Sequence, residues 1–271
     1  IISERYFDQY ESFYWQMYQQ VATRAVSKEC FSMFEILSLE TEYQHELPKL
    51  LQEDKVDGLI IIGSLKESYL KLIEESIHVP MVCLDFYDRK HQCDAVITDN
   101  YYGMYKMTNY LFEMGHEDIA YVGTLLSTSS ITDRYFGYSK ALLEHGKKVR
   151  EDWIIEDRDV DSGKREDDFV FRLPKEMPTA FVCNCDLTAG LLINALREKG
   201  YRVPEDISVI GFDGIDMGNY MSPRLTTIRQ HREEISARSV EILLKSIEEG
   251  IPATHEIEPF HLVPGESVCK H

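Results

Sequence analysis

The sequence predicts an α/β protein built on parallel β-sheets, and two patterns along the chain indicate this. Short apolar runs alternate with amphipathic stretches whose apolar residues recur at helical spacing. Runs that are apolar throughout are typical of parallel strands covered by helices on both faces of a sheet. Several helical stretches also end on glycine, at Gly115, Gly146 and Gly200, and glycine accepts the left-handed conformation that ends a helix.

The strands are expected where the apolar runs lie, and the chain also starts on what looks like a strand. The predicted runs are 58–62, 81–85, 95–98, 119–122, 180–183 and 208–212. Helical spacing of the apolar residues predicts helices over 104–114, 187–196 and 235–243. A further helix is expected to run to Glu144, with Arg134 in its first turn.

Length and charge limit the fold and the kinds of partner that the chain can have. The chain has 271 residues, of which 44% are apolar, which suits one α/β unit or two small lobes with real cores. Acidic residues outnumber basic ones by 47 to 29, for a formal net charge of −18. Such a chain is a poor binder of polyphosphates by itself, because affinity for DNA comes largely from Lys and Arg. If DNA is a partner, this segment does not supply the contact surface.

The cysteines and the missing motifs exclude several classes of protein. No Cys-x-x-Cys pair occurs among Cys30, Cys83, Cys93, Cys183, Cys185 and Cys269. Reduced thiols in a cytoplasmic protein are therefore expected, with no metal and no cofactor. No apolar run approaches the ~20 residues of a membrane helix, and no signal peptide precedes Ile1. The absence of an initiating Met suggests that something upstream was removed. No nucleophile elbow or Walker loop occurs, so an enzyme is not expected.

Polar residues follow several of the predicted strands. Ser64 follows Gly63 at the end of one apolar run, Asp85 and Asp213 follow Leu84 and Phe212, and Asn184 and Asp186 come after another run. Ligands of open parallel sheets bind beyond the carboxyl ends of the strands. Carboxylates placed there can accept hydrogen bonds from a polyhydroxylated ligand. A Ser/Thr-rich segment also precedes Arg134, whose guanidinium is a planar fork of donors that can span two neighbouring hydroxyls. The pattern favours a sugar-like ligand.

A series of motifs resembles the lac/galactose repressor (LacI/GalR) family, in family order from about Val56 to the end. Its first part is Val56–Ile60, Val79–Pro80 and Leu84–Asp85. Its stronger second part is Asp99–Gly103, Gly115–His116, Ile119–Gly123, Ser130–Arg134, Pro178–Phe181, Val203–Asp213 and Pro223–Gln230. Each motif alone is weak, but together they are specific.

The resemblance implies a fold of the periplasmic-binding-protein-like type I. This fold has two Rossmann-like lobes with parallel sheets, joined by a hinge of three crossovers, and binds its effector in the cleft between them. The implied N-terminal lobe is 1–98 plus 228–252, and the C-terminal lobe is 99–227 plus 253–271. The last strand, around 256–263, is expected in the second lobe. A DNA-binding headpiece is expected upstream of this chain.

The resemblance also implies a function. The chain is expected to be the effector-binding and dimerisation domain of a DNA-binding transcriptional regulator, most often a repressor in this family. It would respond to a sugar or related small metabolite and reach operator DNA as a homodimer through the headpiece, with no membrane partner. The alternative is a periplasmic sugar-binding protein of a transporter, against which the Pro223–Gln230 motif and the cysteines argue.

Candidate effector contacts follow position by position. Arg134, Asp213 and Asp85 match family contacts, and Phe13 matches an aromatic residue lining the cleft. The full expected set is Arg134, Asp213, Asp85, Phe13, Cys185, Asp186, Ser64 and Ser130. The chain departs from the family where Cys185 replaces an Asn and Gly214 replaces a second Asp, which puts the identity of the effector in doubt.

Each candidate also has a structural alternative. Arg134 could form a surface salt bridge, Asp213 could cap a local turn, and Asp85 could tie down the next loop. Asp186 is at least as well suited to capping its own helix as to contacting a ligand. Of Asn184 and Cys185 only one should face the cleft, and the family register favours Cys185.

An aromatic cluster lies early in the chain and includes Phe13. We expect most of it to pack in the core, with one or two rings left to stack on a ligand. The cluster comprises Tyr6, Phe7, Phe13, Tyr14 and Trp15.

Overall fold

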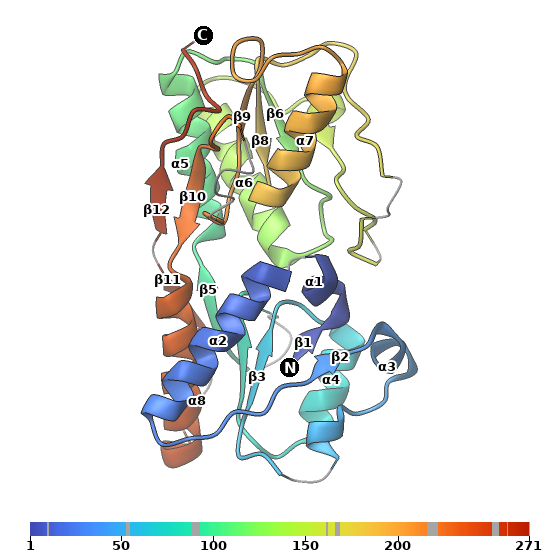
Figure 1. Ribbon diagram of the computed structural model, residues 1–271, viewed down its shortest axis with the longest axis vertical. Coiled ribbons are helices and arrows are strands. Elements are labelled where there is room, and N and C mark those ends of the chain that lie inside the picture. The colour runs from blue at the N-terminus through green and yellow to red at the C-terminus, as the bar shows by residue number, and fades with distance from the viewer. Residues whose placement is uncertain are drawn as a thin grey trace. The chain divides into compact units, whose positions relative to one another are not determined.

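The chain divides into two compact units, each with its own parallel sheet (Figure 1). Unit 1 comprises Ile1–Thr98 and His231–Glu258, and unit 2 comprises Asp99–Gln230 and Pro259–His271. The computed structural model describes residues 1–9, 11–52, 55–87, 93–160, 162–165, 169–215, 222–250, 255–258 and 260–270. The expected crossover near Pro252 lies outside these residues. The α/β fold with two parallel sheets is confirmed.

The sheet of unit 1 has the strand order β11-β5-β4-β3-β1-β2, with every pair parallel. Its strands are β1 (Ile2–Ser3), β2 (Ile36–Leu37), β3 (Leu59–Ile62), β4 (Met81–Leu84), β5 (Asp94–Thr98) and β11 (His255–Glu258). The expected strands at 58–62, 81–85 and 95–98 are confirmed to within one residue. The sequence analysis missed β2, which is too short to show a periodic pattern.

Helices of unit 1 cover this sheet, and α2 packs against α8 (Figure 1). They are α1 (Glu4–Gln9), α2 (Glu11–Ser27), α3 (Leu39–Gln44), α4 (Glu67–Ser76) and α8 (Arg232–Glu249), with a 3-10 turn at Lys49–Leu51. A Cβ at Gly58 would lie 2.9 Å from the Leu243 side chain, so this glycine permits the close approach of α8 to the start of β3. An Arg24–Glu241 ion pair links α2 to α8.

The sheet of unit 2 has the order β7-β6-β8-β9, again parallel. Its strands are β6 (Ile119–Val122), β7 (Ile154–Ile155), β8 (Ala180–Cys183) and β9 (Ser208–Ile210). A separate antiparallel pair joins β10 (Thr227–Gln230) to β12 (Phe260–Val263). The expected strands at 119–122 and 180–183 are confirmed, and the one expected at 208–212 ends earlier, at Ile210.

The helices of unit 2 are α5 (Asn100–Glu113), α6 (Ser129–Glu144) and α7 (Asp186–Glu198), with a 3-10 turn at Glu151–Trp153. Helices α5 and α6 cross closely at Gly137, where a Cβ would lie 2.1 Å from the Tyr101 carbonyl oxygen. Only glycine fits there. Within the described part of the chain, no helix is both long and apolar enough to cross a bilayer.

Two expectations about element boundaries are wrong. The single strand expected over 256–263 is divided: β11 pairs with β5 in unit 1, whereas β12 pairs with β10 in unit 2. Helix α6 begins at Ser129, because the Thr128 hydroxyl accepts a hydrogen bond from the Ile131 N–H and caps the helix. Arg134 therefore lies in the second turn rather than the first.

Candidate ligand-binding site

The Arg134 side chain lies in a buried polar cluster of unit 2, next to Asp213. Its Nε–H donates to Asn100 Oδ1 at 2.8 Å, and its Nη1 donates to the Asn184 carbonyl oxygen at 2.6 Å. Nη2 lies 3.5 Å from Asp213 Oδ1, and the guanidinium lies 3.8 Å from the centre of the Phe212 ring. Because Arg134 is only 5% exposed, it is not a surface salt-bridge residue. The fold therefore brings together the two residues on which the sequence hypothesis depends.

Asp213 follows β9 and is held by contacts with other elements. The Gln230 side chain donates from Nε2 to Asp213 Oδ1 at 2.8 Å, and the Asp213 N–H donates to the Ile228 carbonyl oxygen. Its φ of +118° lies in a region that few non-glycine residues adopt. The described contacts of this carboxylate are with α6 and β10, so capping of a local turn does not explain its position.

A second part of the cluster was missed by the sequence analysis and centres on Asp157, which follows β7 and is fully buried. Arg158 donates to both carboxylate oxygens, at 3.1 and 2.7 Å, and Arg165 donates to Oδ2 at 3.2 Å. Asn184 and Thr188 donate to the same oxygen, at 2.8 and 2.7 Å. Burial alone would raise the pKa of Asp157, but Arg158 and these donors hold it well below its usual value.

Asn184 connects the two parts of the cluster. Its carbonyl oxygen accepts from Arg134, its Oδ1 accepts from Arg158 at 3.1 Å, and its Nδ2 donates to the Val122 carbonyl oxygen. Asn184 is 1% exposed, so these bonds replace its hydration. The family register favoured Cys185 as the ligand-facing residue of this pair, and that stays a prediction. The described bonds show that Asn184 joins the two groups of charged side chains.

The cap of α7 comes from Cys185 rather than from Asp186. Cys185 is the N-cap of α7, and its Sγ accepts from the Thr188 N–H at 3.4 Å. Asp186 instead accepts from the Thr227 hydroxyl at 2.6 Å and from the Ile215 N–H at 2.8 Å. The expectation that Asp186 caps its own helix is therefore wrong.

The pKa values of these two groups reflect their surroundings. Burial, and next the charge of Asp213, raises the pKa of Asp186, while the hydrogen bonds from Thr227 and Ile215 act in the opposite direction. Burial and Asp213 also raise the pKa of the Cys185 thiol, so this thiol is a poor nucleophile.

Ser130 lies in the first turn of α6, within the Ser/Thr-rich segment. Its hydroxyl is 3.0 Å from the Thr128 hydroxyl, and the side chain is partly exposed. The Ser127 hydroxyl donates to the Thr124 carbonyl oxygen, and the Thr132 hydroxyl donates to the Thr128 carbonyl oxygen. These bonds order the start of the helix that carries Arg134.

The candidates of unit 1 lie after its strands and among aromatic rings. Asp85 follows β4 with a φ of +71°, and the Tyr14 hydroxyl donates to its Oδ2 at 3.4 Å. Phe13 is 4% exposed; its ring meets Tyr14 edge-on at 5.0 Å, and the Arg232 guanidinium lies 5.3 Å from its centre. Ser64 follows β3, is half-buried and donates to the Leu65 carbonyl oxygen at 3.5 Å.

The early aromatic cluster is mostly core, as expected. Tyr6, Phe13 and Tyr14 are buried, and the rings of Tyr6 and Tyr14 lie 5.6 Å apart. Trp15 remains 39% exposed and packs edge-on against Phe34. Stacking of Phe13 on a ligand stays a prediction, because this ring is largely enclosed by its own unit.

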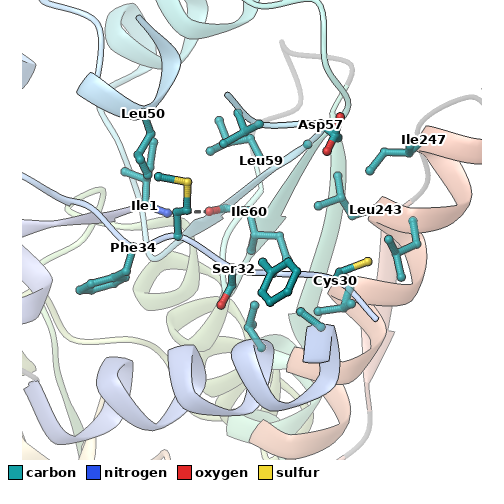
Figure 2. A pocket seen from close by; sticks show the side chains of 18 of the residues that line it. Ile1, Cys30, Ser32, Phe34, Leu50, Asp57, Leu59, Ile60, Leu243 and Ile247 are labelled. Atoms are coloured by element: carbon teal, nitrogen blue, oxygen red, sulfur yellow. Dashed lines mark hydrogen bonds between the residues drawn. The ribbon is translucent and has the colours of Figure 1, made fainter. Parts of the chain in front are cut away.

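A cavity of about 500 Å³ in unit 1 lies away from these residues (Figure 2). It is lined by the last turns of α2 and α8, by the start of β3 and by the segment 29–34. Its described lining is mainly apolar and includes neither Asp85 nor Phe13. Among the residues that the structure describes, no group of three or more His, Cys, Asp or Glu side chains could hold a metal ion.

Known proteins resemble this chain over most of its length. The model of the periplasmic binding protein-like domain matches residues 108–268. The transcriptional repressor PurR of Vibrio campbellii is 33% identical over 225 residues, which is 82% of this chain and 66% of that protein. The chain therefore spans just under two thirds of the length of this relative.

Solved structures share the fold. A LacI-type transcriptional regulator from Bacillus cereus subsp. cytotoxis superposes with a TM-score of 0.84 at 21% identity, covering 100% of this chain and 98% of the other. A LacI family transcriptional regulator from Enterococcus faecium with bound ribose superposes with a TM-score of 0.77 at 23% identity, over the same shares of the two chains. The domain model matches more than half of the chain and therefore shows its family. The chain belongs to the periplasmic binding protein-like family, and its sequence is similar to that of the repressor PurR.

Proposed function

We propose that this chain is the effector-binding and dimerisation domain of a cytoplasmic transcriptional repressor, and that its effector is a small polyhydroxylated metabolite. The supporting observation is the pairing of Arg134 with Asp213 at the carboxyl end of the unit 2 sheet, within a set of buried hydrogen-bonding side chains. The repressor role is proposed from PurR, which is named a transcriptional repressor.

The spacing of Arg134 and Asp213 suits a hydroxylated ligand. Their closest atoms are 3.5 Å apart, longer than the ~2.7–2.9 Å of a direct charge-assisted hydrogen bond. A ligand hydroxyl can donate to the carboxylate and accept from the guanidinium at the same time, because a hydroxyl is both a donor and an acceptor. A related regulator has been solved with ribose, which is consistent with a sugar as ligand here.

Strand-end residues of unit 1 are proposed to complete the contacts. Asp85 offers a carboxylate after β4, Ser64 offers a hydroxyl after β3, and Phe13 offers a ring. In unit 2, Ser130 is proposed as a contact from α6, which also carries Arg134, and Cys185 and Asp186 as contacts from the start of α7. The expectation that both sets face one cleft stays a prediction.

Regulation requires that the effector bind one conformation of the protein better than another, since equal affinity for both shifts no equilibrium. A homodimer is proposed because paired headpieces read the two half-sites of an operator. The DNA contacts would come from a part of the protein outside these 271 residues, because the net charge here is −18. The bound metabolite is released unchanged, as in a receptor rather than an enzyme.

A thermal-shift screen tests the proposal, with ribose and a panel of pentoses, hexoses and nucleosides as probes. A ligand that binds only the folded state raises the melting temperature. Calorimetry with the best probe should then show at least a tenfold loss of affinity in Asp213→Asn, which keeps the shape of the side chain and removes its charge. The exposed Asp118→Asn variant is the matched control. Wild-type affinity in Asp213→Asn would contradict the proposed site.

A further inference from the structure

Two cysteine side chains of unit 1 meet across neighbouring strands. Cys83 lies on β4, and Cys93 directly precedes β5. The strand register pairs Cys83 with Ala95, and alternation along a strand places Cys93 on the same face as Ala95. The two Sγ atoms are 3.2 Å apart, and the residues are 0% and 5% exposed. Ten positions of chain separate them, so the sequence alone did not pair them.

We propose that Cys83 and Cys93 are a redox-active dithiol, which a peroxide converts into an intramolecular disulfide. Cys93, the more exposed of the two, attacks one oxygen of hydrogen peroxide to give a sulfenic acid and releases one water molecule. The sulfur of Cys83 then attacks the sulfur of Cys93, the S–O bond breaks, and a second water leaves with the Cys83 proton. Two thiols and one peroxide thus become one disulfide and two waters, a two-electron oxidation.

The arrangement favours this pair over the other cysteines of the chain. A disulfide bond is about 2.05 Å long, so the sulfurs need to approach by only about 1.2 Å. Cys183 and Cys185 are closer in sequence, but residues two apart along an extended chain project their Cβ atoms in parallel, roughly 6.6 Å apart, whereas the Cβ atoms of a disulfide lie about 3.5–4.5 Å apart. Cys185 also caps α7. Burial slows the attack of the peroxide but protects the sulfenic acid from other thiols, so the reaction ends with Cys83.

The bond would close a short segment of chain that contains Asp85. This residue is a proposed effector contact. It follows β4, and its backbone has a φ of +71°. A link from β4 to the start of β5 fixes the chain on both sides of Asp85. We therefore expect the oxidised protein to differ from the reduced protein in effector affinity. This second expectation rests on the proposed function, whereas the disulfide itself does not.

Peptide mapping of the peroxide-treated protein tests the disulfide. The protein is treated with hydrogen peroxide, its remaining thiols are alkylated under denaturing conditions, and it is digested and analysed by mass spectrometry. We expect a peptide pair containing Cys83 and Cys93, about 2 Da lighter than the two reduced peptides and separated by dithiothreitol. The half-exposed Cys30 and Cys269 report that oxidant has reacted with the protein. Oxidation of these two without any Cys83–Cys93 peptide would overturn the proposal.

Cysteine variants test whether the disulfide joins Cys83 to Cys93 and involves no other cysteine. Cys93→Ser and Cys83→Ser should abolish the linked peptide, and Cys183→Ser, a matched buried cysteine of unit 2, should leave it unchanged. If Cys83→Ser does not fold, Cys93→Ala, at the more exposed position, gives the same answer. The oxidised wild type should melt roughly 5 °C above the reduced form, and Cys93→Ala should show no such difference.

Affinity measurements test the regulatory part separately. The best probe from the thermal-shift screen is titrated into the reduced and the oxidised protein, and we expect at least a threefold difference that Cys93→Ala removes. Equal affinities alongside a mapped disulfide would overturn the regulatory role and leave the redox-active pair standing. If no probe binds either form, the proposed function fails, and the mapped peptide still decides the disulfide.

Discussion

The two units end their parallel strands in polar side chains, but they hold those side chains in different ways. In unit 2, Asp157 is fully buried beneath two guanidiniums and connects through Asn184 to Arg134. In unit 1, Asp85 is half-buried and accepts a long bond from Tyr14, among aromatic rings. Hydrogen-bonded charges therefore hold Asp157 after β7 of unit 2, whereas aromatic packing surrounds Asp85 after β4 of unit 1.

Because of this difference, substitutions at the candidate site of unit 2 are expected to change stability as well as binding. A buried ion pair that loses one partner leaves an uncompensated charge, which costs far more than the pair itself contributes. Side chains of unit 2 that are proposed to bind the effector also support the sheet edge. Removal of Arg134 is therefore expected to lower stability as well as ligand affinity. The two tryptophans report on the unfolding of different units, because Trp153 lies in the core of unit 2 and Trp15 lies in unit 1.

Asp157→Ala should have the largest effect. It leaves Arg158 and Arg165 without their shared carboxylate in a site where Asp157 is 0% exposed, so the free energy of unfolding should fall by about 3–5 kcal/mol. Denaturant unfolding followed by Trp153 emission measures this loss, with the exposed Glu156→Ala as control. A change below about 1 kcal/mol would show that the charges of unit 2 do not organise its sheet edge.

Acid should destabilise unit 2 through the same group. Arg158 and the surrounding donors hold the folded-state pKa of Asp157 below its unfolded value, against the opposing effect of burial. The stabilisation is therefore complete above about pH 4 and is lost as the pH falls from there towards the folded-state pKa. The raised pKa of Asp186 acts in the opposite sense, so the test is the difference between wild type and Asp157→Asn. A pH-independent difference between pH 6 and pH 2.5 would argue against this assignment.

Arg134→Met should have a smaller effect on stability, of about 2–3 kcal/mol, because it keeps the aliphatic stem and removes donors to Asn100 and Asn184. The matched variant of unit 1 is Arg5→Met, which removes the buried pair with Glu42 at 3.0 Å. Both should lower stability, and only Arg134→Met should abolish binding of the sugar probe. Loss of binding in both variants would mean that stability, rather than contact, governs affinity.

Tyr14→Phe should have the smallest effect. It removes a hydroxyl whose bond to Asp85 is 3.4 Å long and leaves the ring packed against Phe13, so we expect less than about 1 kcal/mol. Unfolding followed by Trp15 emission measures it. A loss comparable with that of Arg134→Met would erase the contrast between the two units and show that Asp85 is fixed by hydrogen bonding as well.

Periodicity and motif order predict most of the fold from the sequence alone. Apolar runs predicted β3, β4, β5, β6 and β8, because a strand buried on both faces must be apolar throughout. The short strands β2 and β7 escaped, since two residues carry no period. The split between β11 and β12 escaped as well, because local sequence does not say which sheet a strand joins.

The sequence by itself also predicted that Arg134 and Asp213 lie together, through family motifs and the place of Asp213 after a strand, and the structure brings their side chains to 3.5 Å. Only the tertiary structure brought Asp157, Arg158 and Arg165 to the same sheet edge, gave the helix cap to Cys185 rather than Asp186, and placed Cys83 against Cys93. The physical reason is the distance along the sequence between the residues that determine each feature. Strand and helix patterns are local, whereas the partners of a buried charge or thiol come from distant segments and are set by register and packing.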